Sequence, residues 1–79
     1  MKQTLRQDYN IGEKIKDARA SVGLSQDQVA ARLQIMGCDI SRGTLAKIEA
    51  GIRNIKVSEL SALKKTLKFE YDFIFKDVP

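Results

Sequence analysis

The sequence lacks several residue types on which common protein functions depend. It has no histidine and no tryptophan, one cysteine (Cys38), and one proline, which is the last residue. One cysteine cannot form an intramolecular disulfide, and without histidine or a second cysteine it does not assemble a zinc site. The sequence also has no glycine-rich phosphate loop and no nucleophile paired with a base. We therefore expect no enzyme activity, no cofactor and no metal.

Long apolar runs are also missing. No stretch approaches the ~18 apolar residues of a membrane span, and the N-terminal segment MKQTLRQDYN has no apolar centre typical of a signal peptide. We expect a cytoplasmic protein that does not contact membranes. Of its 79 residues, 43% are hydrophobic and 30% are charged, a composition typical of one small globular domain rather than of a disordered chain.

Positive charge is concentrated in the middle of the chain. The net charge is +4, and residues 41–56 contain four basic residues and one acidic residue, whereas residues 69–79 contain one basic and three acidic. A basic segment inside a folded domain suits a polyanionic partner, although a single cluster of this kind more often covers a solvated helix face. Charge alone therefore makes nucleic acid a candidate partner and does not establish it.

Apolar spacing predicts helices along most of the chain and no sheet. The first helix is predicted to begin after Asn10, because Asn10 and Glu13 have the spacing of a capping box, and to end at Gly23. The residues spaced to form its apolar face are Ile11, Ile15, Ala18 and Val22.

Two serines mark the starts of the next two helices. Ser25 and Gln28 repeat the capping-box spacing and predict a helix over residues 26–33. Ser41 is the expected cap of a helix over residues 42–50.

The C-terminal third contains one further clear helix and one ambiguous segment. Ser58 is the expected cap of a helix with Leu60, Leu63 and Leu67 on one face. Residues 69–75 alternate as a strand does, but a short final helix is the preferred interpretation. The aromatic side chains of this segment are expected in the core, with a dimer surface as the alternative: Phe69, Phe73 and Phe75.

Two short helices joined by a turn, over residues 26–33 and 42–50, are typical of a helix-turn-helix. This motif needs a small residue where the two backbones approach, and Ala30 occupies that place. Leu33 and Leu45 are expected to fill the angle between the helices.

Residues 11–67 resemble the phage repressor/Cro-type (XRE-like) helix-turn-helix domain of bacterial transcription regulators. The segments that carry the resemblance are IGEKIKDAR, GLSQDQVAARL, ISRGTLAKIEAG and SELSALKKTL. The resemblance implies an all-α, lambda-repressor-like compact bundle of four to five short helices, with the recognition helix, about residues 42–50, in the DNA major groove. We expect one domain over residues 1–79, in which 69–79 form a short C-terminal helix or tail.

The resemblance, together with the chemistry of each side chain, assigns three groups of residues. Arg19 and Glu49 match positions that pair inside the domain. The candidates for reading bases are Arg42, Gly43, Thr44, Ala46 and Lys47. The candidates for contacting phosphates are Gln26, Ser41, Arg53, Asn54 and Lys56. Arg42 is the strongest base reader, because a guanidinium forms two hydrogen bonds with guanine. Lys47 alternatively touches only a phosphate, and Gln26 alternatively serves only to start its helix.

The chain departs from the family pattern in the turn of the motif. The segment QIMGCDI separates Leu33 from Ser41, which is about four or five residues more than usual. Either the helix continues to Met36, or a longer loop forms around Gly37.

These features predict a sequence-specific regulator of transcription that binds double-stranded DNA. One small module buries too little surface for tight binding, so we expect a homodimer on a palindromic operator. The alternative is a protein-interaction module with a protein partner, such as the antitoxin of a toxin–antitoxin pair.

Overall fold

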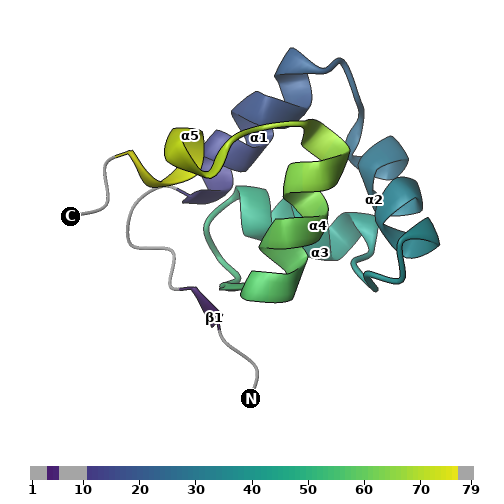
Figure 1. Cartoon of the computed structure of the whole chain (residues 1–79). Helices are drawn as coiled ribbons and strands as arrows, with labels where there is room; N and C mark the ends of the chain where they lie inside the picture. Colours follow the sequence, from purple (N-terminus) through teal and green to yellow (C-terminus); the bar gives the residue numbers. More distant parts are fainter. Residues whose placement is uncertain (1–3, 6–10, 77–79) are drawn as a thin grey trace.

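Five helices and one short pair of strands make up most of the residues that the computed structural model describes, which are 4–5 and 11–76 (Figure 1). The helices are α1 (Ile11–Ser21), α2 (Gln26–Ile35), α3 (Arg42–Glu49), α4 (Val57–Leu67) and α5 (Tyr71–Phe75). The strands are β1 (Thr4–Leu5) and β2 (Ile55–Lys56), which pair antiparallel. The predicted all-α helix-turn-helix bundle is confirmed.

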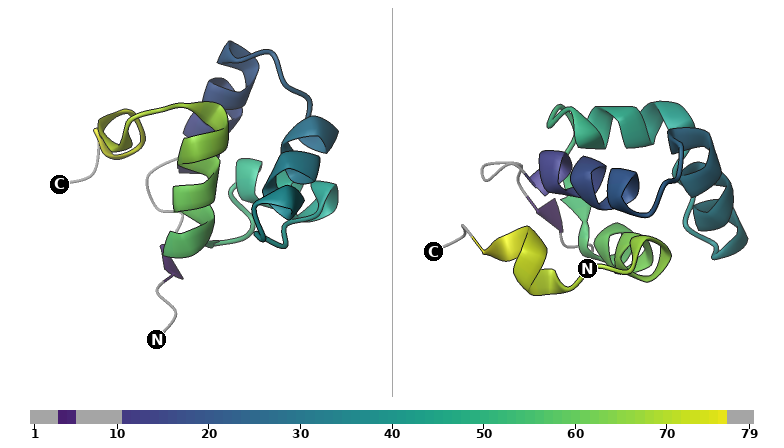
Figure 2. Two further views of the ribbon diagram at one scale, coloured as in Figure 1. Left: turned by 45° about the vertical axis from the view of Figure 1, so that its right-hand side comes forward. Right: turned by 90° about the horizontal axis from the view of Figure 1, so that it is seen from above.

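The helices surround one apolar core. Seen from above, α1 lies between α3 on one side and α4 and α5 on the other, while α2 packs against α3 and α4 at one end (Figure 2). The fully buried side chains come from every helix and from the connections on either side of α3: Ile15, Val29, Leu33, Ile40, Leu45, Ile48, Ile55, Leu63 and Ile74.

The two helices of the motif begin where the sequence predicts. At α2, the backbone N–H of Gln28 donates to Ser25 Oγ (3.1 Å), and the backbone N–H of Ser25 donates to Gln28 Oε1 (2.8 Å). At α3, Ser41 Oγ accepts from the backbone N–H of Thr44 (3.2 Å). These bonds satisfy N–H groups that have no partner inside the helix. The cap predicted at Asn10 lies outside the described residues.

The long turn of the motif begins with an extension of α2. The helix runs to Ile35, two residues beyond the predicted end, and Met36 caps it. Gly37 then takes a left-handed conformation with a φ of 82°. The remainder of the turn is anchored at Ile40, whose side chain is buried and whose carbonyl accepts from Gln34 Nε2 (3.0 Å).

The predicted start of α4 is wrong by two residues. The helix begins at Val57 with Lys56 as its N-cap, so Ser58 lies inside the first turn rather than at the cap. Two contacts accompany this start: the backbone N–H of Lys56 donates to the buried Glu59 carboxylate three residues further on (2.9 Å), and the preceding Ile55 is held in the core. The expectation of essentially no sheet is confirmed, because the strands of the described residues are one two-residue pairing of Thr4 and Leu5 with Lys56 and Ile55.

Two apolar side chains that were expected to be buried, Val22 and Phe73, are partly exposed. Val22 is 38% exposed, because α1 ends at Ser21 and the helical periodicity no longer applies in the turn. Residues 71–75 form the preferred helix, with Phe69 buried just before it. Phe73, however, is 42% exposed, so the prediction that it lies in the core is wrong.

Candidate nucleic-acid interface

The junction of α2 and α3 is closed by apolar side chains. Ala30 is buried, and Leu33 and Leu45 are completely buried. On α3, the core-facing positions are Leu45, Ile48 and Glu49, which leaves the rest of the helix at the surface. The packing therefore gives α3 one face that holds it in the bundle and one that is open to solvent.

All five candidate base readers lie on or beside the open face of α3. Arg42, Gly43 and Lys47 are exposed, and Thr44 and Ala46 are half-buried. A Cβ atom at Gly43 would meet nothing closer than Ser41 Oγ at 4.0 Å, so the bundle itself does not require a glycine there. The helix thus presents two cations and three small or short side chains along one surface.

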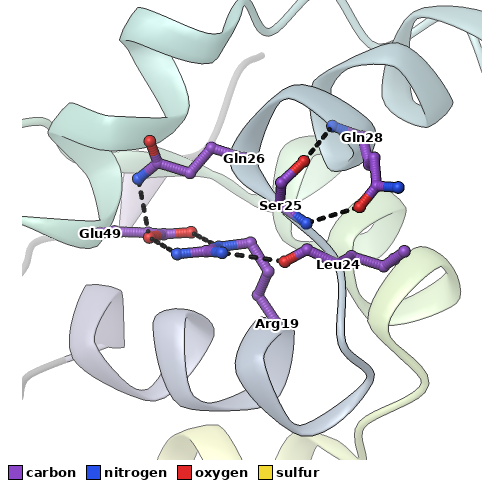
Figure 3. A network of polar contacts seen from close by, with 6 residues as sticks. All are labelled: Arg19, Leu24, Ser25, Gln26, Gln28 and Glu49. Carbon is purple, nitrogen blue, oxygen red and sulfur yellow. Dashed lines mark hydrogen bonds and ion pairs between the residues drawn. The ribbon is translucent and has the colours of Figure 1, made fainter.

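The only carboxylate of α3 faces Arg19 of α1 and Gln26 of α2 (Figure 3). Glu49 is buried and accepts from Arg19 Nε at 2.7 Å and from Arg19 Nη2 at 2.9 Å. Arg19 Nη1 also donates to the carbonyl of Leu24 (2.9 Å). The hydrogen bond with Glu49 raises the pKa of the Arg19 guanidinium. The expected Arg19–Glu49 ion pair is present and ties α1 to α3.

Gln26 joins the same network. Its Nε2 donates to Glu49 Oε1 (3.0 Å), and the carboxylate therefore connects the first turn of α2 to the last turn of α3 (Figure 3). Because a carboxylate only accepts, this bond determines which end of the Gln26 amide faces Glu49. Gln26 was predicted to contact a phosphate or only to start its helix, and the bond to Glu49 is a structural role that neither prediction includes.

Ser41 and Arg42 make contacts within the motif. Ser41 Oγ donates to Thr44 Oγ1 (3.1 Å) in addition to accepting the capping bond. Arg42 Nε lies 3.6 Å from Asp27 Oδ1, and both side chains are largely exposed. Asp27 was not among the predicted site residues.

The connection after α3 contains a second ion pair, between Arg53 and Glu59, which was not predicted from the sequence. Arg53 Nη1 and Nη2 donate to Glu59 Oε1 and Oε2, each at 2.9 Å. Burial of Glu59 opposes its ionisation, but the Arg53 hydrogen bonds and the Lys56 backbone N–H outweigh burial and lower the pKa of this carboxyl. The signal in the sequence for the contact between Glu59 and Lys56 was the position of this acidic residue in the first turn of a helix, three residues after the N-cap.

The candidate phosphate contacts between α3 and α4 therefore differ from one another in exposure and in contacts. Arg53 is half-buried and held by Glu59, whereas Asn54 is exposed and Lys56 is half-buried at the start of α4. The structure brings Ser41 and Gln26 to the ends of the two motif helices, and Arg53, Asn54 and Lys56 to the segment between α3 and α4.

Residues 4–5 and 11–76 contain neither a membrane-spanning helix nor a cluster of metal-binding side chains. Within these ranges no helix is long and apolar enough to cross a bilayer. The same residues contain no group of three or more acidic or cysteine side chains placed to hold a metal ion.

Comparison with known proteins places the chain in a family. A family model described as helix-turn-helix matches residues 15–74, which extend from α1 into α5. No curated protein and no solved structure matches the chain significantly. The family match covers well over half of the sequence and includes both helices of the motif. The chain therefore belongs to the helix-turn-helix family of XRE-like type, whose members are DNA-binding regulators of transcription.

Proposed function

We propose that this protein binds specific sequences in double-stranded DNA, with α3 in the major groove, and thereby regulates transcription. One observation carries the proposal: Glu49, the only acid of α3, is turned inward to Arg19, while Arg42 and Lys47 face solvent. The surface of α3 is consequently positive, as a polyanion requires. The major groove is wide enough to admit an α-helix.

Arg42 is the principal base reader in this proposal. Its guanidinium opens α3, and in helix-turn-helix proteins the first residues of the recognition helix contact base edges. A bidentate contact with guanine O6 and N7 is worth about 1–3 kcal/mol of discrimination. Thr44, Ala46 and Lys47 read neighbouring positions, and Gly43 allows the helix backbone to approach the bases.

The remaining candidates dock the module on the DNA backbone. Gln26 and Ser41 lie at helix N-termini, where backbone N–H groups and the helix dipole favour phosphate. Lys56 and Asn54 contact phosphates beyond the end of α3, with Arg53 beside them. Because Glu59 already neutralises much of the Arg53 charge, we assign the larger electrostatic contribution to Lys56.

Two copies of the chain bind a palindromic operator. Dimeric helix-turn-helix proteins contact half-sites about 34 Å apart, and the second module doubles the contact surface. The family match does not favour the alternative of a protein-interaction module.

Selection from a random duplex library, followed by affinity measurements on the enriched sequence, tests this function. We expect a motif with two-fold symmetry. Arg42→Ala abolishes the preference at one base pair per half-site. Lys56→Ala weakens binding to all duplexes similarly and reduces the slope of log K against log salt by about one. Lys65→Ala is the matched control, because Lys65 is an exposed lysine of α4 that is not among the candidate DNA contacts. Enrichment of no motif would overturn sequence-specific binding.

A further inference from the structure

Asp27 and Arg42 bring opposite charges together at the start of the two motif helices. Asp27 lies in the first turn of α2 and Arg42 is the first residue of α3, with Oδ1 and Nε 3.6 Å apart. The side chains are 76% and 65% exposed. An ion pair this open to water contributes little to the stability of a fold.

The position of Arg42 is unfavourable for α3 itself. The N-terminus of a helix carries a partial positive charge, so a cation there is repelled and an acid is preferred. The first turn of α3 has no acidic residue, and Asp27 from α2 supplies the nearby negative charge. Helix stability therefore does not explain Arg42, whereas contact with a ligand does.

The atoms in contact leave the recognition end of the guanidinium available. Asp27 lies against Nε, while the two parallel donors that match guanine O6 and N7 are provided end-on by Nη1 and Nη2. Once DNA displaces water from the pair, a carboxylate beside Nε would restrict the directions in which that fork points. The same negative charge repels phosphates, so it weakens contacts that carry no sequence information.

We propose that Asp27 is a specificity-determining residue that positions Arg42 for a base and lowers the affinity for DNA in which that base is absent. The inference rests on the proposed function. It assigns to α2, the helix expected only to dock on the backbone, a part in base readout. The ion pair strengthens when DNA displaces water from it, because charges interact more strongly at lower dielectric.

Asp27→Asn tests the inference, measured by fluorescence anisotropy at several salt concentrations. The duplexes are the selected operator, the operator changed at the base pair read by Arg42, and a random duplex. We expect tighter binding to the random duplex, with a steeper salt dependence. In the wild type, a bidentate contact should give an affinity ratio between the operator and the changed operator of roughly five- to hundredfold. In Asp27→Asn we expect this ratio to fall by about threefold or more. Asp27→Glu restores the ratio in part.

Two further variants separate positioning from other effects. Asp17→Asn makes the same charge change on α1, in a groove lined by α4 and α5 residues, and is expected to leave the ratio unchanged. In an Arg42→Ala background, Asp27→Asn should no longer change the ratio, because no guanidinium remains to be positioned. A role for Asp27 only as an acid at the N-terminus of α2 predicts altered thermal stability with an unaltered ratio.

The outcomes distinguish a failure of sequence-specific binding from a failure of the role of Asp27. If the wild-type chain enriches no motif, the proposed function fails and this inference fails with it. If the wild type selects a motif and Asp27→Asn keeps the full ratio, the inference alone is wrong. If Asp27→Asn lowers the affinity ratio by the same factor in the wild type and in the Arg42→Ala background, the proposed positioning of Arg42 by Asp27 is also wrong.

Discussion

The backbones of Gly12 and Ile48 meet where α1 crosses α3, so closely that a Cβ atom at position 12 would overlap the Ile48 carbonyl oxygen. Ile48 itself is fully buried in α3, and Gly12 is buried in the first turn of α1. Only glycine lets the two helices approach to this distance. This contact sets how α3 is seated on the bundle.

Gly12→Ala is accordingly expected to destabilise the fold. Alanine favours a helix over glycine by about 1 kcal/mol, but forcing a methyl group into a packed contact costs about 1–3 kcal/mol or more, here against unyielding backbone. We expect the free energy of unfolding, from urea denaturation followed by circular dichroism, to fall by about 2 kcal/mol.

The matched control for Gly12→Ala is Gly43→Ala in α3. Space is open at position 43, so alanine there should raise the free energy of unfolding by about 1 kcal/mol. Similar changes in the two variants would contradict the close approach of α1 and α3.

Acid should weaken the fold through Glu59. The folded-state pKa of this carboxyl lies below its ordinary value of 4.5, so its stabilising contribution is complete above that value and is lost as the pH falls through the folded-state pKa. Glu59→Gln is expected to lower the free energy of unfolding by about 1–2 kcal/mol at pH 7. It should also flatten the dependence of stability on pH below about 5.

Urea titrations from neutral to acid pH measure this dependence, with Glu70→Gln, at an exposed position, as the reference for removing a carboxylate. An unchanged slope in Glu59→Gln relative to the wild type would show that the Arg53 contact does not hold the carboxylate ionised.

Lys68→Gly should stabilise the protein. Lys68 caps the C-terminus of α4 with a φ of 60° and a ψ of 42°, a left-handed conformation that costs a non-glycine residue about 1–2 kcal/mol. The greater freedom of glycine in the unfolded chain offsets part of this gain. We expect a rise in Tm of about 2–6 °C in differential scanning calorimetry. Lys65→Gly, inside the same helix, should lower Tm.

Cys38 should react slowly in the folded protein. Burial, assisted by the nearby Glu59 charge, raises the pKa of its thiol, and the thiol packs against the core. We expect alkylation by iodoacetamide at pH 8 to be about tenfold slower in native protein than in urea.

A comparison cysteine tests whether the local environment causes the slow reaction. Ala31 is exposed on α2, so Ala31→Cys in a Cys38→Ser background should react at nearly the same rate folded and unfolded. Equal rates for the two cysteines in the native state would contradict the shielding of Cys38.

How well the sequence predicted each helix depended on the range of the interactions involved. The starts of α2 and α3 were correct, because Ser25 and Ser41 cap these helices by bonds to residues three positions away. The start of α4 was wrong, because two local signals compete there: Ser58, and the bond from the Lys56 backbone N–H to Glu59, which is also three positions away. Burial of Ile55 and the ion pair of Glu59 with Arg53 accompany the cap at Lys56. A sequence shows both local signals, but not the contacts with the core that favour one of them.

The sequence by itself determined the family and the helix-turn-helix motif, and the family resemblance implied the pairing of Arg19 with Glu49. Apolar spacing and caps repeat along the chain, and the motif residues keep fixed separations. Only the tertiary structure decided that position 12 must be glycine, that Glu59 holds Arg53, and that Asp27 faces Arg42. The physical reason is that these contacts join different helices and connections, whose crossing and distance are set by how the whole core packs.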